Sequence, residues 1–133
     1  MRFIWIAAST AVLLSLNAQA QTWEQLAVGG DGTRYAIDTS TMKMTSYGGT
    51  EVWVRAVSNK AKRVFSKKAS PTYTEFLARS TFNCGQFTSH TGYMIYRDRN
   101  GENVHTESSP GMSVPVVPGS IGHTLYEKVC PSE

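Results

Sequence analysis

The side chains most capable of chemistry are three histidines, and their spacing forms no recognisable catalytic or metal-binding motif. His90, His105 and His123 are far apart, and no two have the His-x-x-x-His spacing that places two metal ligands on one face of a helix. The segment Gly119-Ser120-Ile121-Gly122 lacks the Gly-x-Ser-x-Gly pattern of a hydrolase nucleophile. We therefore expect no catalytic residue, metal or cofactor. A small hydrolase assembled from distant Ser, His and Asp residues is kept as an alternative.

Two glycine-containing segments share some features with ligand-binding loops. Asp98-Arg99-Asn100-Gly101 begins like a calcium loop, but the glycine required at the sixth position and the glutamate required at the twelfth are missing. Gly29-Gly30-Asp31-Gly32 lacks the Gly-Lys-Ser/Thr ending of a phosphate-binding loop. Both segments are predicted to be turns. Asn100-Gly101 favours a type I′ hairpin turn, in which both central residues have positive φ.

The segment most capable of binding is strongly basic. It holds five cations within nine residues, with an aromatic residue between them: Lys60, Lys62, Arg63, Phe65, Lys67 and Lys68. Clustered cations attract polyanions in a salt-sensitive way, and an aromatic ring can add a stacking contact. We predict a long exposed hairpin arm or loop that could bind a polyanion. The alternative is that these charges only keep a loop in solvent.

The N-terminal residues have the pattern of a secretory signal peptide. Arg2 is followed by an apolar stretch over 3–16 and by Ala18-Gln19-Ala20, so we expect cleavage after Ala20. The apolar stretch is shorter than the roughly 20 residues of a spanning helix, and no cysteine follows the cleavage point. We expect an exported protein, periplasmic or secreted, that is not a lipoprotein and has no transmembrane segment in its mature chain. An uncleaved N-terminal anchor is the alternative.

Removal of residues 1–20 leaves a single predicted domain, 21–133, of 113 residues with a net charge of +2. Export also decides how its two cysteines are interpreted. In an oxidising compartment Cys84 and Cys130 are predicted to form a disulfide, because neither belongs to a Cys-x-x-Cys pair. An exported domain is not expected to meet intracellular nucleic acid.

Most of the mature chain has the pattern of antiparallel strands. In 50–58, Val52, Val54 and Ala56 alternate with polar or larger residues, which predicts a strand with one buried face. Turn residues separate the other predicted strands, at 22–28, 34–38, 73–83, 92–97 and 102–107. Within 73–83, the stretch 74–79 is also compatible with a helix. Prolines and glycines predict irregular structure over 109–119.

The last predicted element is a short helix. Ser120 is a suitable N-cap, and Ile121, Leu125 and Val129 recur at intervals of four, which places them on one face. Pro131 ends the helix. The fold class that follows is α+β: a small antiparallel β-sheet with a C-terminal α-helix packed on it, stapled by one disulfide.

Short motifs in a fixed order give the chain a family resemblance. They are Trp23, Tyr35-x-Ile37-Asp38-x-Ser40, Val52-Trp53-x-Arg55, Cys84, Val116-x-Pro118-Gly119-Ser120 and Leu125-Tyr126-x-x-Val129-Cys130. Over nearly the whole mature chain they resemble the bacterial surface-adhesin protein E family. The resemblance implies a small exported domain without enzymatic activity. The best-described members are surface lipoproteins that bind host extracellular proteins, whereas this chain lacks the lipid-bearing cysteine.

The sequence thus favours a non-enzymatic binding module that recognises an extracellular or envelope protein or a polyanion. An accessory component of a bacterial envelope assembly is the alternative from another functional class. Among the motif residues, Trp23 and Trp53 are expected to pack in the core or at its edge, and Arg55 to extend across an aromatic ring such as Trp53.

Overall fold

The computed structural model describes residues 22–108 and 111–131, which form seven strands and one helix. The strands are β1 (Trp23–Val28), β2 (Arg34–Met44), β3 (Gly49–Arg63), β4 (Thr72–Asn83), β5 (Thr88–Arg97), β6 (Asn103–Ser108) and β7 (Val114–Pro115), and the helix is α1 (Ile121–Val129). The predicted signal peptide, 1–20, lies outside the described residues.

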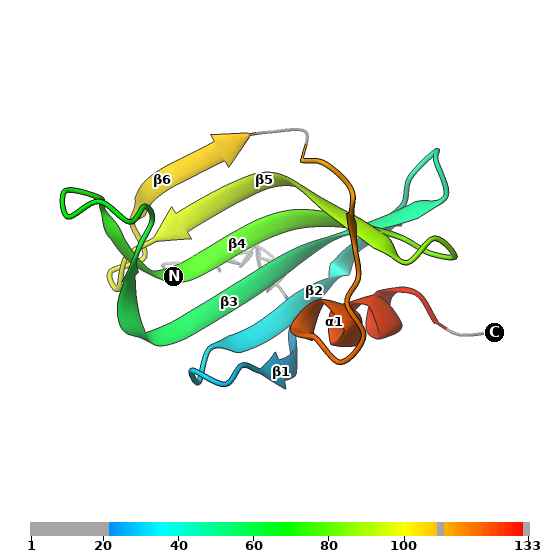
Figure 1. The fold of residues 1–133 in the computed structure, drawn as a ribbon, viewed down its shortest axis with the longest axis horizontal. Coiled ribbons are helices and arrows are strands. Elements are labelled where there is room, and N and C mark those ends of the chain that lie inside the picture. Colours follow the sequence, from blue (N-terminus) through cyan, green and yellow to red (C-terminus); the bar gives the residue numbers. More distant parts are fainter. Residues whose placement is uncertain (1–21, 109–110, 132–133) are drawn as a thin grey trace, which may run out of the picture.

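All strand pairs in the sheet are antiparallel, and six strands follow one another in chain order from β1 to β6 (Figure 1). The two-residue strand β7 pairs with the start of β5, whereas β6 pairs with the later part of β5. Because consecutive strands of the sheet run in opposite directions, the turns β1–β2, β3–β4 and β5–β6 lie at the same end of the sheet. We call this the hairpin end.

The long central strands arise from the alternation seen in the sequence. In β3, Val52 and Val54 are buried while Trp53 and Arg55, which alternate with them, are partly exposed, as a strand with one buried face requires. The segment 73–83 is a strand and not a helix, because β4 pairs with β3 on one side and β5 on the other. The predicted α+β fold with an antiparallel sheet is confirmed.

The predicted hairpin at Asn100-Gly101 is confirmed, but its predicted type I′ turn is wrong. Only Gly101 has a positive φ, of 80°. The Asp98 carboxylate accepts hydrogen bonds from the backbone N–H groups of Asn100 (2.9 Å) and Glu102 (3.0 Å). These bonds stabilise a longer loop, closed by the Asp98 N–H bond to the Glu102 carbonyl (2.9 Å), in which one left-handed residue is enough.

The helix α1 covers one face of the sheet at the end opposite the hairpin end (Figure 1). Ser120 caps it as predicted, because its hydroxyl accepts a hydrogen bond from the His123 N–H at 3.2 Å. The core contains residues from both the sheet and α1, and from positions next to them: Ile37, Val52, Val54, Phe82, Val116, Leu125, Tyr126, Val129 and Cys130. Burial of this apolar cluster is what fixes the helix on the sheet.

The predicted disulfide is confirmed, and it attaches the end of α1 to the turn between β4 and β5. Cys84 and Cys130 are bonded, with their Cα atoms 5.4 Å apart. Beside the bridge, the Tyr126 hydroxyl accepts a hydrogen bond from the Gly85 N–H at 2.9 Å. The end of the helix is thus held by a covalent bond and by a polar contact.

The prediction of irregular structure over 109–119 is wrong at one point. Val114–Pro115 forms β7, whose register pairs Ser89 with Val114 and Thr88 with Pro115. A proline is tolerated in so short a strand at the margin of a sheet. Next to it, Val116 donates its N–H to the Phe87 carbonyl (2.8 Å) and buries its side chain in the core. This anchoring explains why the segment is extended along β5.

Candidate binding site

The predicted basic segment lies at the hairpin end of the sheet. The strand β3 continues past the predicted boundary at Ser58 to Arg63, so Lys60 and Lys62 lie on a strand. The turn that follows carries Lys67 and Lys68, and both are exposed. We refer to 59–72 as the basic arm. The expected exposed hairpin arm is therefore present, at the end of the sheet opposite α1 (Figure 1).

Hydrogen bonds and an aromatic contact order the turn of the basic arm. The Val64 N–H donates to the Pro71 carbonyl at 3.0 Å, and the Phe65 N–H donates to the Ser70 hydroxyl at 2.7 Å. The Phe65 ring packs edge-on against His105 of β6, with 5.1 Å between ring centroids. The arm therefore contacts β6, the last strand in the order of the sheet, while Phe65 remains 48% exposed.

One of the five predicted cations is neutralised. The Lys62 ammonium group lies 2.7 Å from Asp31 Oδ2 and donates to the Thr33 hydroxyl at 3.0 Å. The hydrogen bond from Lys62 holds the pKa of Asp31 well below its usual range, and the same bond raises the pKa of Lys62. Both groups therefore stay charged at neutral pH, and their charges cancel.

The other four predicted cations, Lys60, Arg63, Lys67 and Lys68, are exposed. Arg99, in the β5–β6 turn, lines a shallow groove of about 290 Å³ together with Ala61 and Thr72 of the arm. Arg99 was not among the cations predicted from the sequence. Its signal was available, because alternate turns of an antiparallel meander lie at the same end of the sheet.

A pocket of about 220 Å³ opens beside the arm. Four aromatic residues, Tyr35, Tyr73, Phe76 and Tyr96, line it together with the hydroxyl-bearing residues Ser58 and Thr74, and Lys62 lies at its border. The Tyr96 ring packs against Tyr73 (4.8 Å between centroids) and Phe76 (4.9 Å). The register aligns Tyr35 with Ala56 and Phe76 with Tyr96, so three neighbouring strand pairs assemble the site.

The surroundings of Tyr96 in the pocket favour its neutral phenol. Burial, helped by Glu107 and Tyr73, raises the pKa of Tyr96 above its ordinary value of 10.0. Its hydroxyl therefore remains protonated at physiological pH, so it can donate a hydrogen bond as well as accept one.

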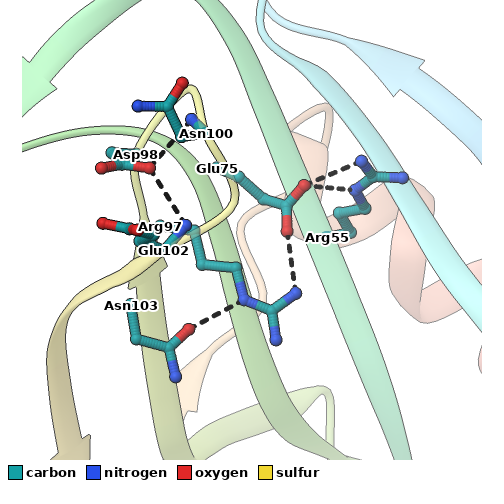
Figure 2. A network of polar contacts seen from close by, with 7 residues as sticks. All are labelled: Arg55, Glu75, Arg97, Asp98, Asn100, Glu102 and Asn103. Carbon is teal, nitrogen blue, oxygen red and sulfur yellow. Dashed lines mark hydrogen bonds and ion pairs between the residues drawn. The ribbon is translucent and has the colours of Figure 1, made fainter.

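A network of charges ties together three central strands. Glu75 accepts two hydrogen bonds from Arg55, at 2.8 and 3.0 Å, and its other oxygen lies 3.4 Å from Arg97 Nη1 (Figure 2). Arg97 also donates to the Asn103 side chain at 2.9 Å. The register places Glu75 opposite Arg97, so the network links β3, β4 and β5 in their observed pairing.

Trp23 and Trp53 lie outside the buried core cluster, and the predicted partner of Arg55 is wrong. Trp53 packs edge-on against Tyr93, with 6.2 Å between centroids. The Arg55 guanidinium lies 5.7 Å from the ring centroid of Trp23 and not over Trp53. Trp53 and Arg55 lie on the same face of β3, and the register of β1 and β2 brings Trp23 of β1 within reach of Arg55 on that face.

Comparison with known proteins assigns the chain to a family. A model of the surface-adhesin protein E family matches residues 23–131, which include every strand and the helix. The chain belongs to the surface-adhesin protein E family. A search of curated proteins found no match. Family membership supports an adhesin-like binding role and an exported protein. In the described part of this adhesin E domain, no helix has the length and apolar character needed to cross a membrane.

The polar residues first considered for chemistry are dispersed in the adhesin E fold. His90 lies on β5, His105 on β6 and His123 on α1. Residues 22–108 and 111–131 contain no group of three or more His, Cys, Asp or Glu side chains that could hold a metal ion. The Ser120 hydroxyl donates to the Val117 carbonyl at 2.6 Å while it caps the helix. Its hydrogen bonds are those of a structural cap.

Proposed function

We propose that this adhesin E domain is exported to the periplasm or the cell exterior, where its basic arm binds a partner with clustered negative charge. One observation carries the proposal: four predicted cations stay exposed on the basic arm, whose turn is ordered by hydrogen bonds, and Arg99 shares a groove with the arm. Because the backbone of the turn is already ordered, the arm loses less backbone freedom when a ligand binds. An acidic stretch of an extracellular or envelope protein fits this surface, as does another polyanion.

The arm has two properties that suit such a role. Lys62 is already paired with Asp31, so its role is to hold the arm against the β1–β2 turn. Phe65 is half exposed while its other side rests on His105, so it offers an aromatic surface among the cations. Charge would attract the partner and the ring would add a short-range contact.

The test compares two variants with the same net charge. The arm variant replaces Lys60, Arg63, Lys67 and Lys68 by Gln. The control variant replaces four cations elsewhere in the sheet and helix by Gln, namely Arg34, Lys43, Arg79 and Lys128. Binding to heparin and to poly-glutamate is measured by calorimetry, and folding by circular dichroism. We expect the arm variant to lose at least about tenfold in affinity and the control variant to lose less. Equal losses would remove the arm from the mechanism.

Export is tested separately on the full-length protein. N-terminal sequencing of the protein recovered from the envelope or the medium should give a chain that begins at Gln21. A chain that retains its first 20 residues in a membrane fraction would instead support an uncleaved anchor. Crosslinking in intact cells would capture a fixed envelope complex if the protein were an accessory component of an assembly. Capture that persists in the arm variant would count against the basic arm.

A further inference from the structure

We propose that the aromatic pocket beside the basic arm is a binding site for a single neutral sugar ring. The site differs from the exposed outer cations in both place and chemistry, so it goes beyond the proposed polyanion binding and either proposal can fail alone. Three observations carry it: the size of the pocket, the kinds of group that line it, and the cancelled charge at its border.

The size restricts the ligand to about one ring. Pockets that hold drug-sized molecules have volumes of about 300 to 1,000 Å³. The pocket here, at about 220 Å³, is smaller and is open to solvent. A ligand of one ring can enter while the rest of a longer chain of sugars stays outside.

The lining combines flat apolar surfaces with hydroxyl groups. One face of a pyranose ring presents C–H groups that pack well against the electron-rich face of an aromatic ring. Its edge presents hydroxyls, each of which both donates and accepts hydrogen bonds. Tyr35, Tyr73 and Tyr96 offer aromatic surfaces, and their phenols, like the hydroxyl of Thr74, can donate and accept in return. A purely apolar ligand would leave these polar groups without partners.

The charge at the border favours an uncharged ligand. Asp31 neutralises Lys62, and two of the three ammonium hydrogens point to Asp31 and Thr33. The third hydrogen is left to donate to a sugar hydroxyl. The four aromatic rings could also surround a quaternary ammonium group, but the neutral Lys62–Asp31 pair offers such a cation no charge partner. An anionic ligand would gain little from a lysine that is already paired.

The pocket is already shaped before a ligand binds. The Tyr96 ring is held edge-on by Tyr73, with 76° between the two ring planes, and is also tilted against Phe76. The His105 ring also packs against Tyr96, with 5.6 Å between ring centroids. Phe65 of the arm packs in turn against His105. These contacts restrict the side-chain rotations that a ligand would otherwise have to freeze.

The test is an NMR titration of the mature protein with neutral sugars. The probes are the methyl glycosides of glucose, galactose and mannose, and N-acetylglucosamine, with choline and glucuronate as charged comparisons. We expect at least one neutral sugar to shift the amide signals of Ala56, Ser58 and Thr74 in a saturable way, with a dissociation constant in the millimolar range. The absence of such shifts up to about 100 mM of every neutral sugar would overturn the proposal. Saturable shifts with choline alone would also overturn it.

Variants then locate the site. Tyr73→Ala removes one wall of the pocket and should weaken sugar binding at least about tenfold. Tyr93→Ala is the matched control, because Tyr93 packs against Trp53 outside the pocket. If Tyr73→Ala is poorly folded, Ala56→Leu tests the same site by filling the pocket while every aromatic residue is kept. Sugar binding that survives in a folded Tyr73→Ala or Ala56→Leu variant would contradict the assignment. The four-Gln arm variant should bind the sugar normally, whatever its affinity for heparin.

Discussion

Ionic contacts contribute differently to the stability of this protein, because they differ in their exposure to solvent. Glu75 is 18% exposed and joins two arginines, whereas Lys43, which pairs with Glu51, is 69% exposed. Solvent screens an exposed pair and leaves its side chains mobile, so such a pair contributes little to stability. The Arg55–Glu75–Arg97 network is therefore the ionic contact that matters most for the register of the central strands.

Replacement of Glu75 tests this difference. Glu75→Gln leaves Arg55 and Arg97 close together without their shared carboxylate, and we expect it to lower the free energy of unfolding by about 1 to 2 kcal/mol. Glu51→Gln is the matched control and should cost at most about 0.5 kcal/mol. Urea denaturation followed by circular dichroism measures both values. Similar losses in the two variants would show that the network is no stronger than a surface pair.

The Asp31–Lys62 pair predicts how stability changes with pH. The pKa of Asp31 is lowered, so its contribution is present above the ordinary value of 3.8 and is lost as the pH falls through the folded-state pKa. The pKa of Lys62 is raised, so its contribution is present below 10.5 and is lost only as the pH rises beyond that value. Asp31→Asn should slightly lower the melting temperature at pH 7, and the gap from the wild type should narrow below pH 3.8. A gap that widens in acid would contradict this.

At the scale of elements, local patterns predicted what local forces determine. The alternation in β3 and the four-residue spacing in α1 reflect one-sided burial, and the Ser120 cap depends on adjacent residues alone. The end of β3 was not predictable in this way. Beyond Ser58 the strand continues across an irregularity in register, because Lys62 and Arg63 find partners in Tyr73 and Thr72. Pairing with another strand, not intrinsic preference, decides such a boundary.

The aromatic pocket also could not be predicted from the sequence. Tyr35, Tyr73 and Tyr96 come from three strands that are far apart in the chain, and only the register between the strands brings them together. The basic segment was visible because its cations are contiguous. The pairing of Lys62 with Asp31 could not be predicted in this way, because the two residues belong to different hairpins.

The disulfide supports a prediction at the same scale, because it holds α1 to the sheet. Loss of the bridge between Cys84 and Cys130, which are 46 residues apart, should cost about 4 kcal/mol through the greater freedom of the unfolded chain. The variant Cys84→Ala/Cys130→Ala should therefore unfold at a markedly lower urea concentration, close to that of the reduced wild type. Thiol labelling of the denatured, unreduced wild type should find no reactive cysteine. Two reactive thiols would disprove the bridge.

Over the whole molecule, the ends of the sheet have opposite characters. The core and α1 lie at one end, while the basic arm and Arg99 lie at the other (Figure 1). Among the exposed apolar side chains, Met44, Tyr47 and Met112 lie on segments away from the hairpin end, whereas Val28 and Phe65 lie at it. The surface proposed to bind through charge is therefore separated from the part of the fold that provides most of the stability.

This separation predicts different responses to salt. An increase from about 50 to 200 mM salt should weaken heparin binding at least about tenfold, because counterions compete for the exposed cations of the arm. The melting temperature should change little, since apolar burial in the core does not depend on screening. Calorimetric titration and thermal unfolding at the two salt concentrations measure these responses. Heparin affinity that is independent of salt would contradict a charge-driven arm.

The position of α1 at the end of the chain has a consequence for the order of folding. The helix supplies Leu125, Tyr126 and Val129 to a core whose other members include Ile37 and Val52, from the first half of the chain. The N-terminal residues emerge first, whether the chain leaves a ribosome or crosses a membrane. Hairpins can therefore form in succession from neighbouring segments. The apolar face of the sheet nevertheless stays uncovered until the residues of α1, which follow all the described strands, arrive. A nascent chain stalled before residue 121 would thus be the species most in need of a chaperone.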